Sequence, residues 1–216
     1  MSPPPDGVRV TWDDPEVVAR YAERSSVPGP RDQGERLLVD LLPARTRQVV
    51  DLGCGDGRLA AALLAARPEL ESVVAIDRSP PMLERARERF AGEARVEIRD
   101  GDLAAPLDGL SDVDAVVSGL AIHHLEDDRK RSLFGEVRRT LRPGGVFADL
   151  DVVASATDRR HREFLAAIDR PADDPEDRLA AVDDQLEWLR DAGFVEVDCL
   201  WRWRGFALLV GEAPDR

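Results

Sequence analysis

Short apolar runs alternate with longer amphipathic stretches through most of this chain. Five such runs predict β-strands at 48–52, 73–77, 95–99, 113–118 and 146–151. Most are apolar at successive positions, which is typical of strands covered by helices on both faces, whereas 95–99 alternates as a strand nearer an edge does. Strands separated by helical stretches predict an α/β fold with a doubly wound parallel sheet.

The two ends of the chain show other patterns. Two helices are expected before the first strand, at about 15–24 and 31–42, and two more at about 157–169 and 178–191, separated by the acidic run PADDPED. Strands at 194–201 and 203–210 lie so close in sequence that they should pair as an antiparallel hairpin. We expect a single domain over 1–216. Its regions are a helical cap (1–43), a core (44–151), a helical segment (152–192) and the hairpin (193–216).

Composition narrows the possible partners and the compartment. The 216 residues carry 30 basic and 43 acidic side chains, a net charge of −13, so a nucleic-acid partner is unlikely. Cys54 and Cys199 are too few for a disulfide framework, and two free thiols favour the cytoplasm. We find no leader pattern and no window long enough to span a membrane, and so expect no membrane partner. The sequence is compatible with a monomer or a homodimer.

The segment VVDLGCGDGRLA (49–60) carries the strongest chemical signal. Gly53, Gly55 and Gly57 stand at alternate positions between a strand and a helix, where glycine lets the backbone approach a ligand. The lysine of a phosphate-binding loop is missing, and Gly57 comes one residue early for a dinucleotide fingerprint. The charge of Asp51 would repel a pyrophosphate and attract an ammonium group.

Polar residues also follow the next two strands. Asp77 ends the second strand, where an acid can accept hydrogen bonds from both hydroxyls of a ribose. Asp102, after the third strand, is placed to accept from an adenine amino group, with Leu103 and Met82 offering apolar contact to the ring. The predicted ligand therefore carries a ribose and a positive group. Alternatively, Asp102 caps the following turn and Met82 belongs to the core.

These residues closely resemble the class I S-adenosylmethionine-dependent methyltransferases. The resemblance rests on D-x-G-x-G-x-G at 51–57, the acid Asp77, Gly-Asp at 101–102, DAVVSGLAIHHL at 114–125 and LRPGGVF at 141–147. It spans roughly 48–150, and the last helix and hairpin are similar too. It implies S-adenosylmethionine as the cofactor and a Rossmann-like, seven-stranded sheet with order 3-2-1-4-5-7-6, strand 7 antiparallel and helices on both faces.

The resemblance also implies roles for single residues. It puts Asp51 near the methionine end of the cofactor, Asp77 on the ribose, and Asp102 with Leu103 on the adenine. Tyr21 and Arg31 are further candidates for the methionine end. Other residues in the loops and at the strand ends are also expected to contact the cofactor: Gly53, Cys54, Gly55, Arg78, Met82, Ser118 and Gly119. Cys54 is equally compatible with packing inside its loop.

His123 and His124 follow the fourth strand, where the family passes beside the reactive methyl group and the acceptor. We expect no metal, because adjacent side chains tend to point apart, His161 lies in another segment, and no series of acidic ligands is present. One histidine is expected to pack against the sheet and bond a backbone carbonyl. At least one is expected to bind the acceptor or remove its proton, oriented by Asp149 or Asp151.

The sequence thus predicts a methyltransferase acting on a small molecule. Alternatives are a tRNA-modifying enzyme, an enzyme related to a carboxylated form of the cofactor, and a catalytically silent cofactor-binding subunit. The run Trp-Arg-Trp-Arg at 201–204 resembles a base-stacking surface. On a strand, however, its tryptophans and arginines would face opposite sides, which favours a packed edge.

Overall fold

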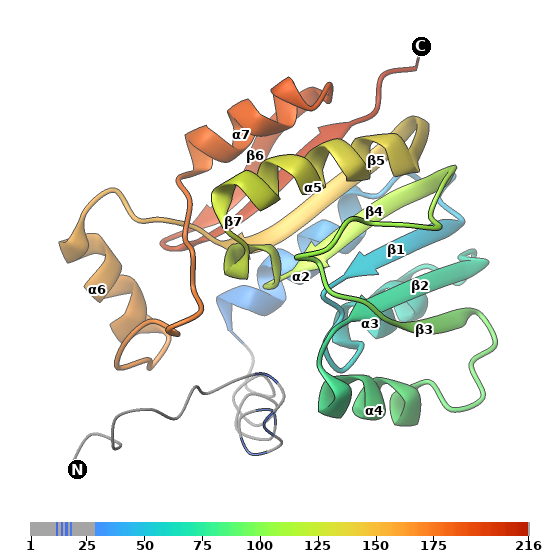
Figure 1. Ribbon diagram of the computed structural model, residues 1–216, viewed down its shortest axis with the longest axis horizontal. Coiled ribbons are helices and arrows are strands. Elements are labelled where there is room, and N and C mark those ends of the chain that lie inside the picture. Colours follow the sequence, from blue (N-terminus) through green and yellow to red (C-terminus); the bar gives the residue numbers. More distant parts are fainter. Residues whose placement is uncertain (1–11, 13, 15, 17, 19–28, 216) are drawn as a thin grey trace.

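The computed structural model describes residues 12, 14, 16, 18 and 29–215. Its centre is a seven-stranded sheet in the order β3-β2-β1-β4-β5-β7-β6 (Figure 1), so the order implied by the resemblance is confirmed. β7 runs antiparallel to both its neighbours. The strands are β1 Gln48–Leu52, β2 Ser72–Asp77, β3 Val96–Asp100, β4 Val113–Gly119, β5 Leu141–Val152, β6 Val195–Trp203 and β7 Phe206–Glu212.

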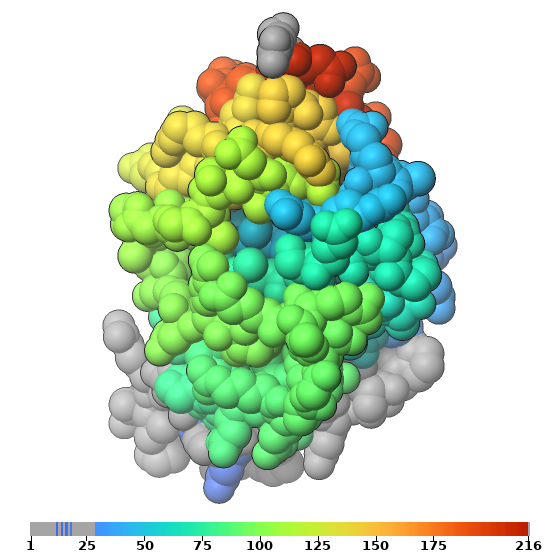
Figure 2. All heavy atoms as spheres, turned by 90° about the vertical axis from the view of Figure 1, so that its right-hand side faces the viewer, coloured from blue at the N-terminus to red at the C-terminus, as the bar shows by residue number. Residues whose placement is uncertain are grey.

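Helices cover both faces of this sheet. On one face, Leu38 of α2 and Leu63 of α3 pack against the strands, and on the other face Phe134 of α5 and Trp188 of α7 do so. Figure 2 shows one face of the molecule as spheres, with the segment that contains β3 (green) toward the bottom and C-terminal residues (red) at the top. The helices are α2 Pro30–Leu41, α3 Arg58–Ala66, α4 Pro80–Arg89, η1 Ile122–His124, α5 Asp127–Thr140, α6 Asp158–Ala167 and α7 Val182–Asp191.

The parallel strands end at one edge of the sheet. Leu52 of β1 pairs with Ile76 of β2 on one side and with Ser118 of β4 on the other. After β1 the chain continues to β2 on one side of the sheet, and after β4 it continues to β5 on the other side. Open α/β sheets bind ligands at the point where the strand order reverses in this way. The register therefore brings the loops after these strands together.

The structure refines several sequence expectations. β5 begins at Leu141 and not at Val146, because residues 142–145 join the strand through an irregularity that shifts its register against β4. In β6 the tryptophans are half-buried and Arg202 is exposed, so the alternation expected there is confirmed. Cys54 and Cys199 are free thiols. Most of the first expected helix, with Tyr21, lies outside the described residues, and no described helix could cross a membrane.

Candidate active site

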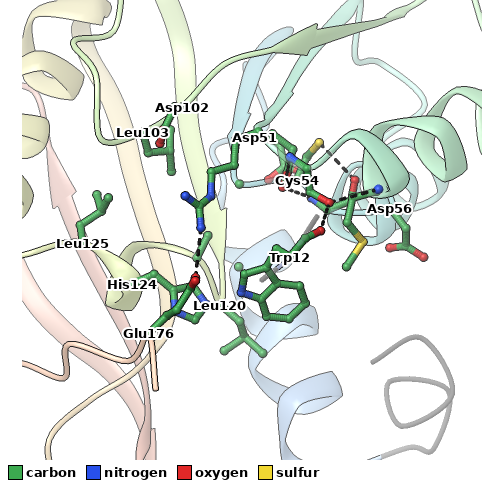
Figure 3. Close-up of a pocket in the computed structure, with 18 of the residues that line it drawn as sticks. Trp12, Asp51, Cys54, Asp56, Asp102, Leu103, Leu120, His124, Leu125 and Glu176 are labelled. Atoms are coloured by element: carbon green, nitrogen blue, oxygen red, sulfur yellow. Dashed lines mark hydrogen bonds and ion pairs between the residues drawn. The ribbon is translucent and has the colours of Figure 1, made fainter. Parts of the chain in front are cut away.

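A cavity of about 570 Å³ lies at the carboxyl edge of the parallel strands (Figure 3). Its wall is built from the loops after β1, β2, β3 and β4, together with Pro175, Glu176 and Arg178. Cys54 and Asp56 lie at one side of it, and Leu120 and His124 at another. Arg31 lines it, and so do ten of the eleven residues predicted to contact the cofactor: Asp51, Gly53, Cys54, Gly55, Asp77, Arg78, Met82, Asp102, Leu103 and Gly119.

The glycine loop has a backbone that other residues adopt at a cost. Gly53 and Gly55 have positive φ angles of 68° and 55°, in the left-handed region. A Cβ atom on Gly53 would lie 2.1 Å from the Cβ of Ala121, whereas one on Gly55 would meet only the sulfur of Met82, at 3.8 Å. Gly53 therefore keeps the loops after β1 and β4 close together, and Gly55 leaves its backbone open to the cavity.

Asp51 is the least satisfied polar group of this cavity. Its side chain is buried, and neither carboxylate oxygen accepts a hydrogen bond from any described residue. Burial, with the nearby charge of Asp77, raises the pKa of Asp51 to about 7. A positive group in the cavity would pair with this carboxylate and remove the cost of burying it alone.

Asp77 shapes the site as well as lining it. One of its oxygens accepts from the backbone N–H of Gly55 at 2.7 Å, and the other from that of Ser79 at 2.9 Å. Burial raises the pKa of Asp77, although these hydrogen bonds oppose that shift. Each carboxylate oxygen has a second lone pair, so Asp77 can hold the loop and still accept from ligand hydroxyls.

The residues expected around an adenine ring lie on another part of the wall. Leu103 and Met82 are almost wholly buried there. Asp102 accepts from the backbone N–H of Ala104 at 2.9 Å, so the capping alternative is present. Asp102 also lines the cavity, and its second oxygen is available to a ligand because a cap occupies only one.

Three further predicted residues differ in their surroundings. Burial raises the pKa of the Cys54 thiol above its usual range, so this side chain stays uncharged where it lines the cavity. Arg78 forms an ion pair of 3.0 Å with Glu176, which joins the loop after β2 to the acidic segment. Ser118 is fully buried, donates to the carbonyl of Leu52 at 3.0 Å and does not line the cavity. The structure therefore gives Ser118 the role of joining β4 to β1.

Sequence reasoning missed several wall residues. Trp12, Leu120 and Leu125 line the cavity, as do Glu176 and Arg178. Trp12 stands outside any motif, whereas Leu120 and Leu125 belong to the stretch 114–125 that carries the resemblance but were not singled out in it. The other two follow from the acidic run at 171–177, which the fold brings back against the strand ends.

A second cavity of about 470 Å³ adjoins the first. Both cavities are lined by Trp12, Arg31, Leu120 and His124, so they meet at these residues. The segment after β5 forms much of the second wall. It contributes Ala167, Ile168, Asp169, Arg170, Asp174 and Asp177, and His123 also faces this cavity.

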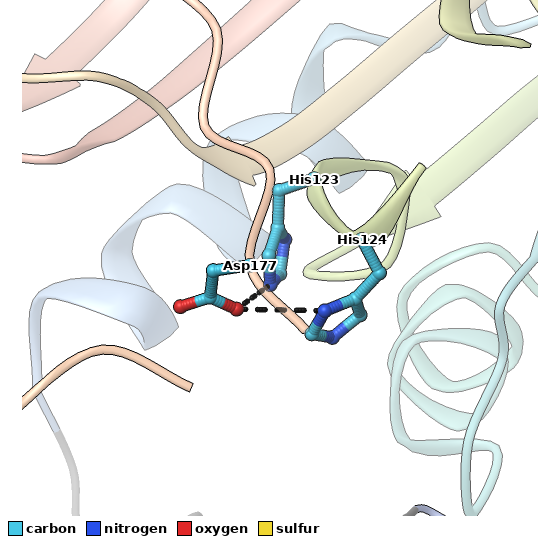
Figure 4. Close-up of side chains that lie close together, drawn as sticks. All are labelled: His123, His124 and Asp177. Atoms are coloured by element: carbon cyan, nitrogen blue, oxygen red, sulfur yellow. Dashed lines mark ion pairs between the residues drawn. The ribbon is translucent and has the colours of Figure 1, made fainter. Parts of the chain in front are cut away.

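The two histidines lie together and not apart (Figure 4). Their ring centroids are 4.1 Å apart, so the expectation that adjacent side chains point apart is wrong here. The reason is the tight turn η1, which carries both rings to one side, where Asp177 faces them. Its Oδ1 lies 3.4 Å from Nε2 of His123 and 3.4 Å from Nδ1 of His124. The acid comes from the distant acidic run and not from neighbouring positions.

Their surroundings give the two histidines different charges. His123 is buried, and its Nδ1 is hydrogen-bonded to Asp151, so this ring packs against a carboxylate and not against the expected carbonyl. Burial by itself would lower the pKa of His123, but Asp151 and Asp177 raise it to about 10. Burial and the charge of His123 lower the pKa of His124 to about 4. Near neutral pH, His124 is the uncharged ring.

The comparisons with known proteins agree with this geometry. A family model described as a methyltransferase domain matches residues 49–145. An uncharacterized methyltransferase of Mycobacterium bovis is 38% identical over 114 residues, which are 53% of this chain and 55% of that protein. A carboxy-S-adenosyl-L-methionine synthase of Desulforapulum autotrophicum is 27% identical over 227 residues, covering 93% of this chain and 89% of that protein.

A solved structure shows the same fold over nearly the whole chain. It is human N-acetylserotonin methyltransferase in complex with S-adenosylmethionine, with a TM-score of 0.71 and 15% identity, covering 94% of this chain and 57% of that one. The chain spans about half the length of the first of these curated relatives. S-adenosylmethionine is the cofactor of this family, and the unpaired Asp51 and the open backbone at Gly55 fit it. Residues 49–145 therefore match the model of a methyltransferase domain, and the sheet around them has the strand order that the resemblance to the class I methyltransferases implied.

Proposed function

We propose that this protein transfers the methyl group of S-adenosylmethionine to a small molecule held in the second cavity. The observation that carries the proposal is the junction of the two cavities at Leu120 and His124. When bound, S-adenosylmethionine supplies an electrophilic methyl group on a sulfonium sulfur. A second molecule must reach that group in line, and the adjoining cavity provides a place for it.

The residues of the first cavity suit the ammonium group, the ribose and the adenine ring of the cofactor. Asp51, buried and without a donor among the described residues, would hold the ammonium group. Asp77 would accept from the ribose hydroxyls. Asp102 would accept from the adenine amino group, with the ring between Leu103 and Met82. The other predicted contacts, Gly53, Cys54, Gly55, Arg78 and Gly119, would supply backbone and wall around it.

The second cavity is of the size that small ligands occupy. Arg31 and Arg170 face it, as do Asp169 and Asp174, so its wall offers both charges to a polar acceptor. The net charge of −13 opposes a nucleic-acid acceptor. A small polar acceptor is therefore favoured over tRNA.

The histidines would act on the acceptor side. His124 lines both cavities and is uncharged near neutral pH, so it can accept a hydrogen bond or a proton from the acceptor. His123 is fixed between Asp151 and Asp177 and would position His124 and the acceptor. Asp151 is the orienting acid in this arrangement, because Asp149 makes no hydrogen bond to either ring.

One alternative has an observation in its favour. The carboxy-S-adenosyl-L-methionine synthase relative matches 93% of this chain in sequence, whereas the methyltransferase-domain model matches residues 49–145. Under this alternative the chain would modify the cofactor itself. Mass spectrometry of S-adenosylmethionine after incubation with the protein and carboxylic acids would reveal a carboxylated product, which a methyltransferase would not form.

Calorimetry and a labelling assay test the proposal. S-adenosylmethionine and S-adenosylhomocysteine are both expected to bind, and failure of both would overturn it. Cofactor labelled in the methyl group is then incubated with a metabolite pool or with tRNA. Label is expected in a small product. Label in tRNA would show that the acceptor is tRNA and not a small molecule. Cofactor binding without any methyl transfer would indicate a catalytically silent cofactor-binding subunit.

A further inference from the structure

Three ligand atoms surround one point at the wall of the second cavity: Nε2 of His123, Nδ1 of His124 and Oδ1 of Asp177 (Figure 4). The carboxylate oxygen lies 3.4 Å from each nitrogen, and all three atoms are within 4.8 Å of one another. These separations are long for hydrogen bonds, which bring N and O to about 2.7–3.2 Å. Ligand atoms that share a tetrahedral metal at about 2.1 Å stand about 3.4 Å apart.

Two of the three atoms are buried without a hydrogen bond. Neither Nδ1 of His124 nor Oδ1 of Asp177 has a hydrogen-bond partner among the described residues. The Asp177 side chain is only 5% exposed, so its Oδ1 is largely withdrawn from bulk solvent. Such atoms cost free energy unless a ligand satisfies them, and a cation at the shared point would satisfy both.

The surrounding structure fixes the orientation of these ligands. Nδ1 of His123 is hydrogen-bonded to the buried Asp151 of β5, and this leaves Nε2 directed at the shared point. Histidines that bind metals almost always use their other ring nitrogen in this way. Asp177 is held by its backbone, because its N–H donates to the carbonyl of Asp174 at 2.9 Å and the next N–H donates to that of His123 at 2.8 Å.

We propose that His123, His124 and Asp177 bind one divalent transition-metal ion. Two imidazoles and one carboxylate suit zinc or iron better than magnesium or calcium, which prefer oxygen ligands. Three protein ligands leave a position open toward the second cavity, which is the arrangement of catalytic sites and not of structural ones.

The ion would bind the acceptor of the proposed function, so this part of the inference rests on that function. An acceptor hydroxyl or amine would occupy the open position and be fixed beside the junction of the two cavities. A bound hydroxyl loses its proton to water more readily, because the cation stabilises the oxygen anion. In the metal-bound protein the two histidines serve as ligands, and the ion replaces His124 as the group that promotes deprotonation.

Metal binding can be measured without any methyl transfer. The full chain is stripped with EDTA, dialysed and titrated with ZnCl₂ in a calorimeter, and with CoCl₂ while the visible absorption of the cobalt ion is recorded. One ion per chain is expected for both, and MgCl₂ is expected to give no comparable heat. Absence of stoichiometric zinc and cobalt binding would overturn the proposal.

Single variants locate the ion. Asp177→Asn and His124→Ala are expected to lower zinc affinity at least tenfold and to change the cobalt spectrum. Asp151→Asn, which removes a positioning residue, is expected to weaken affinity by about 10–100-fold while leaving one ion per chain. The matched control is His161→Gln, because the third histidine also faces an acid, Asp173, at 2.8 Å, but lies outside the cluster. Thermal melting of each variant checks that it folds.

The outcomes separate this inference from the proposed function. Zinc affinity that is unchanged in Asp177→Asn and His124→Ala, or lost equally in His161→Gln, would overturn the metal site. Methyl transfer that continues at the same rate in EDTA, in a protein that binds no zinc, would overturn the metal site and leave the methyltransferase proposal standing. Zinc binding without any binding of S-adenosylmethionine would overturn the methyltransferase proposal and leave the metal site standing.

Discussion

The cofactor side and the acceptor side of this site are built in different ways. The first cavity draws its acids and glycines from short segments at the ends of adjacent strands, and each segment carries its own local pattern. The second joins a turn after β4, the end of β5 and an acidic loop about 50 residues beyond the histidines. A binding site made by strand register is visible in sequence, whereas one made by a returning loop is not.

The largest expected effect is a loss of turnover in histidine variants, which tests the acceptor side separately from the cofactor side. His124→Ala is expected to lower kcat by about 10²–10⁴, because it removes the group that acts on the acceptor. His123→Ala is expected to lower kcat as well, because it removes the residue that positions His124. S-adenosylmethionine affinity should change little in His123→Ala, since His123 lines only the second cavity. Steady-state kinetics with the identified acceptor and calorimetry with the cofactor measure the two effects. Unchanged turnover in both variants would remove the histidines from the mechanism.

Asp51→Asn is the complementary test on the cofactor side. Losing the charge that faces the ammonium group is expected to weaken S-adenosylmethionine binding by about a hundredfold, or about 3 kcal/mol. Calorimetry measures this change. Asp102→Asn serves as the comparison, because it removes a more exposed charge that faces only an uncharged amino group in the proposed function, and it is expected to have a smaller effect. Equal effects of the two variants would contradict the special place of Asp51.

Gly53→Ala tests whether the two loops must stay in contact. The new Cβ would lie 2.1 Å from that of Ala121 at a φ of 68°. We expect a loss of about 2–4 kcal/mol in the free energy of unfolding, from left-handed strain and overpacking together. Gly92→Ala has a φ of 87° with no atom within 4 Å, so it measures the strain alone. Urea unfolding of both would show the difference, and equal losses would argue against the close contact.

The pH dependence of cofactor binding gives the smallest effect. With its pKa near 7, Asp51 is largely protonated at pH 6 and largely ionised at pH 8 in the empty protein. If only the ionised form binds the ammonium group, affinity should rise by about tenfold across this range, with proton release at the lower pH. Calorimetry in buffers of different ionisation enthalpy measures both, and Asp51→Asn should remove the dependence.

The same group predicts how the stability of the empty protein changes with pH. The pKa of Asp51 is raised above its usual 3.8, so between about 4 and 7 the folded protein keeps a proton that the unfolded chain has lost. Unfolding then releases a proton, and this contribution to stability falls as the pH rises through the window. Urea unfolding of the wild type and Asp51→Asn at pH 5 and 8 should show a smaller fall in the variant.

Most of the sheet could be predicted because its determinants are local. Apolar runs predicted β1 and β2, and the glycine loop that follows β1 marked the end of that strand. The order of the strands came from the resemblance and is confirmed. Ser118 shows a limit of such reasoning, since its place at the end of β4 suggested a ligand contact while its hydroxyl turns to the carbonyl of Leu52.

The sequence by itself determined the parallel α/β sheet, the glycine loop and the acids at the strand ends, because strand register places motif residues at one edge without further information. Only the tertiary structure decided the surroundings of His123 and His124. The turn η1 makes their rings converge, Asp151 fixes one of them, and the acidic loop brings Asp177 to face both. These contacts depend on how a distant segment packs against the strand ends, and no periodicity in the sequence encodes that packing.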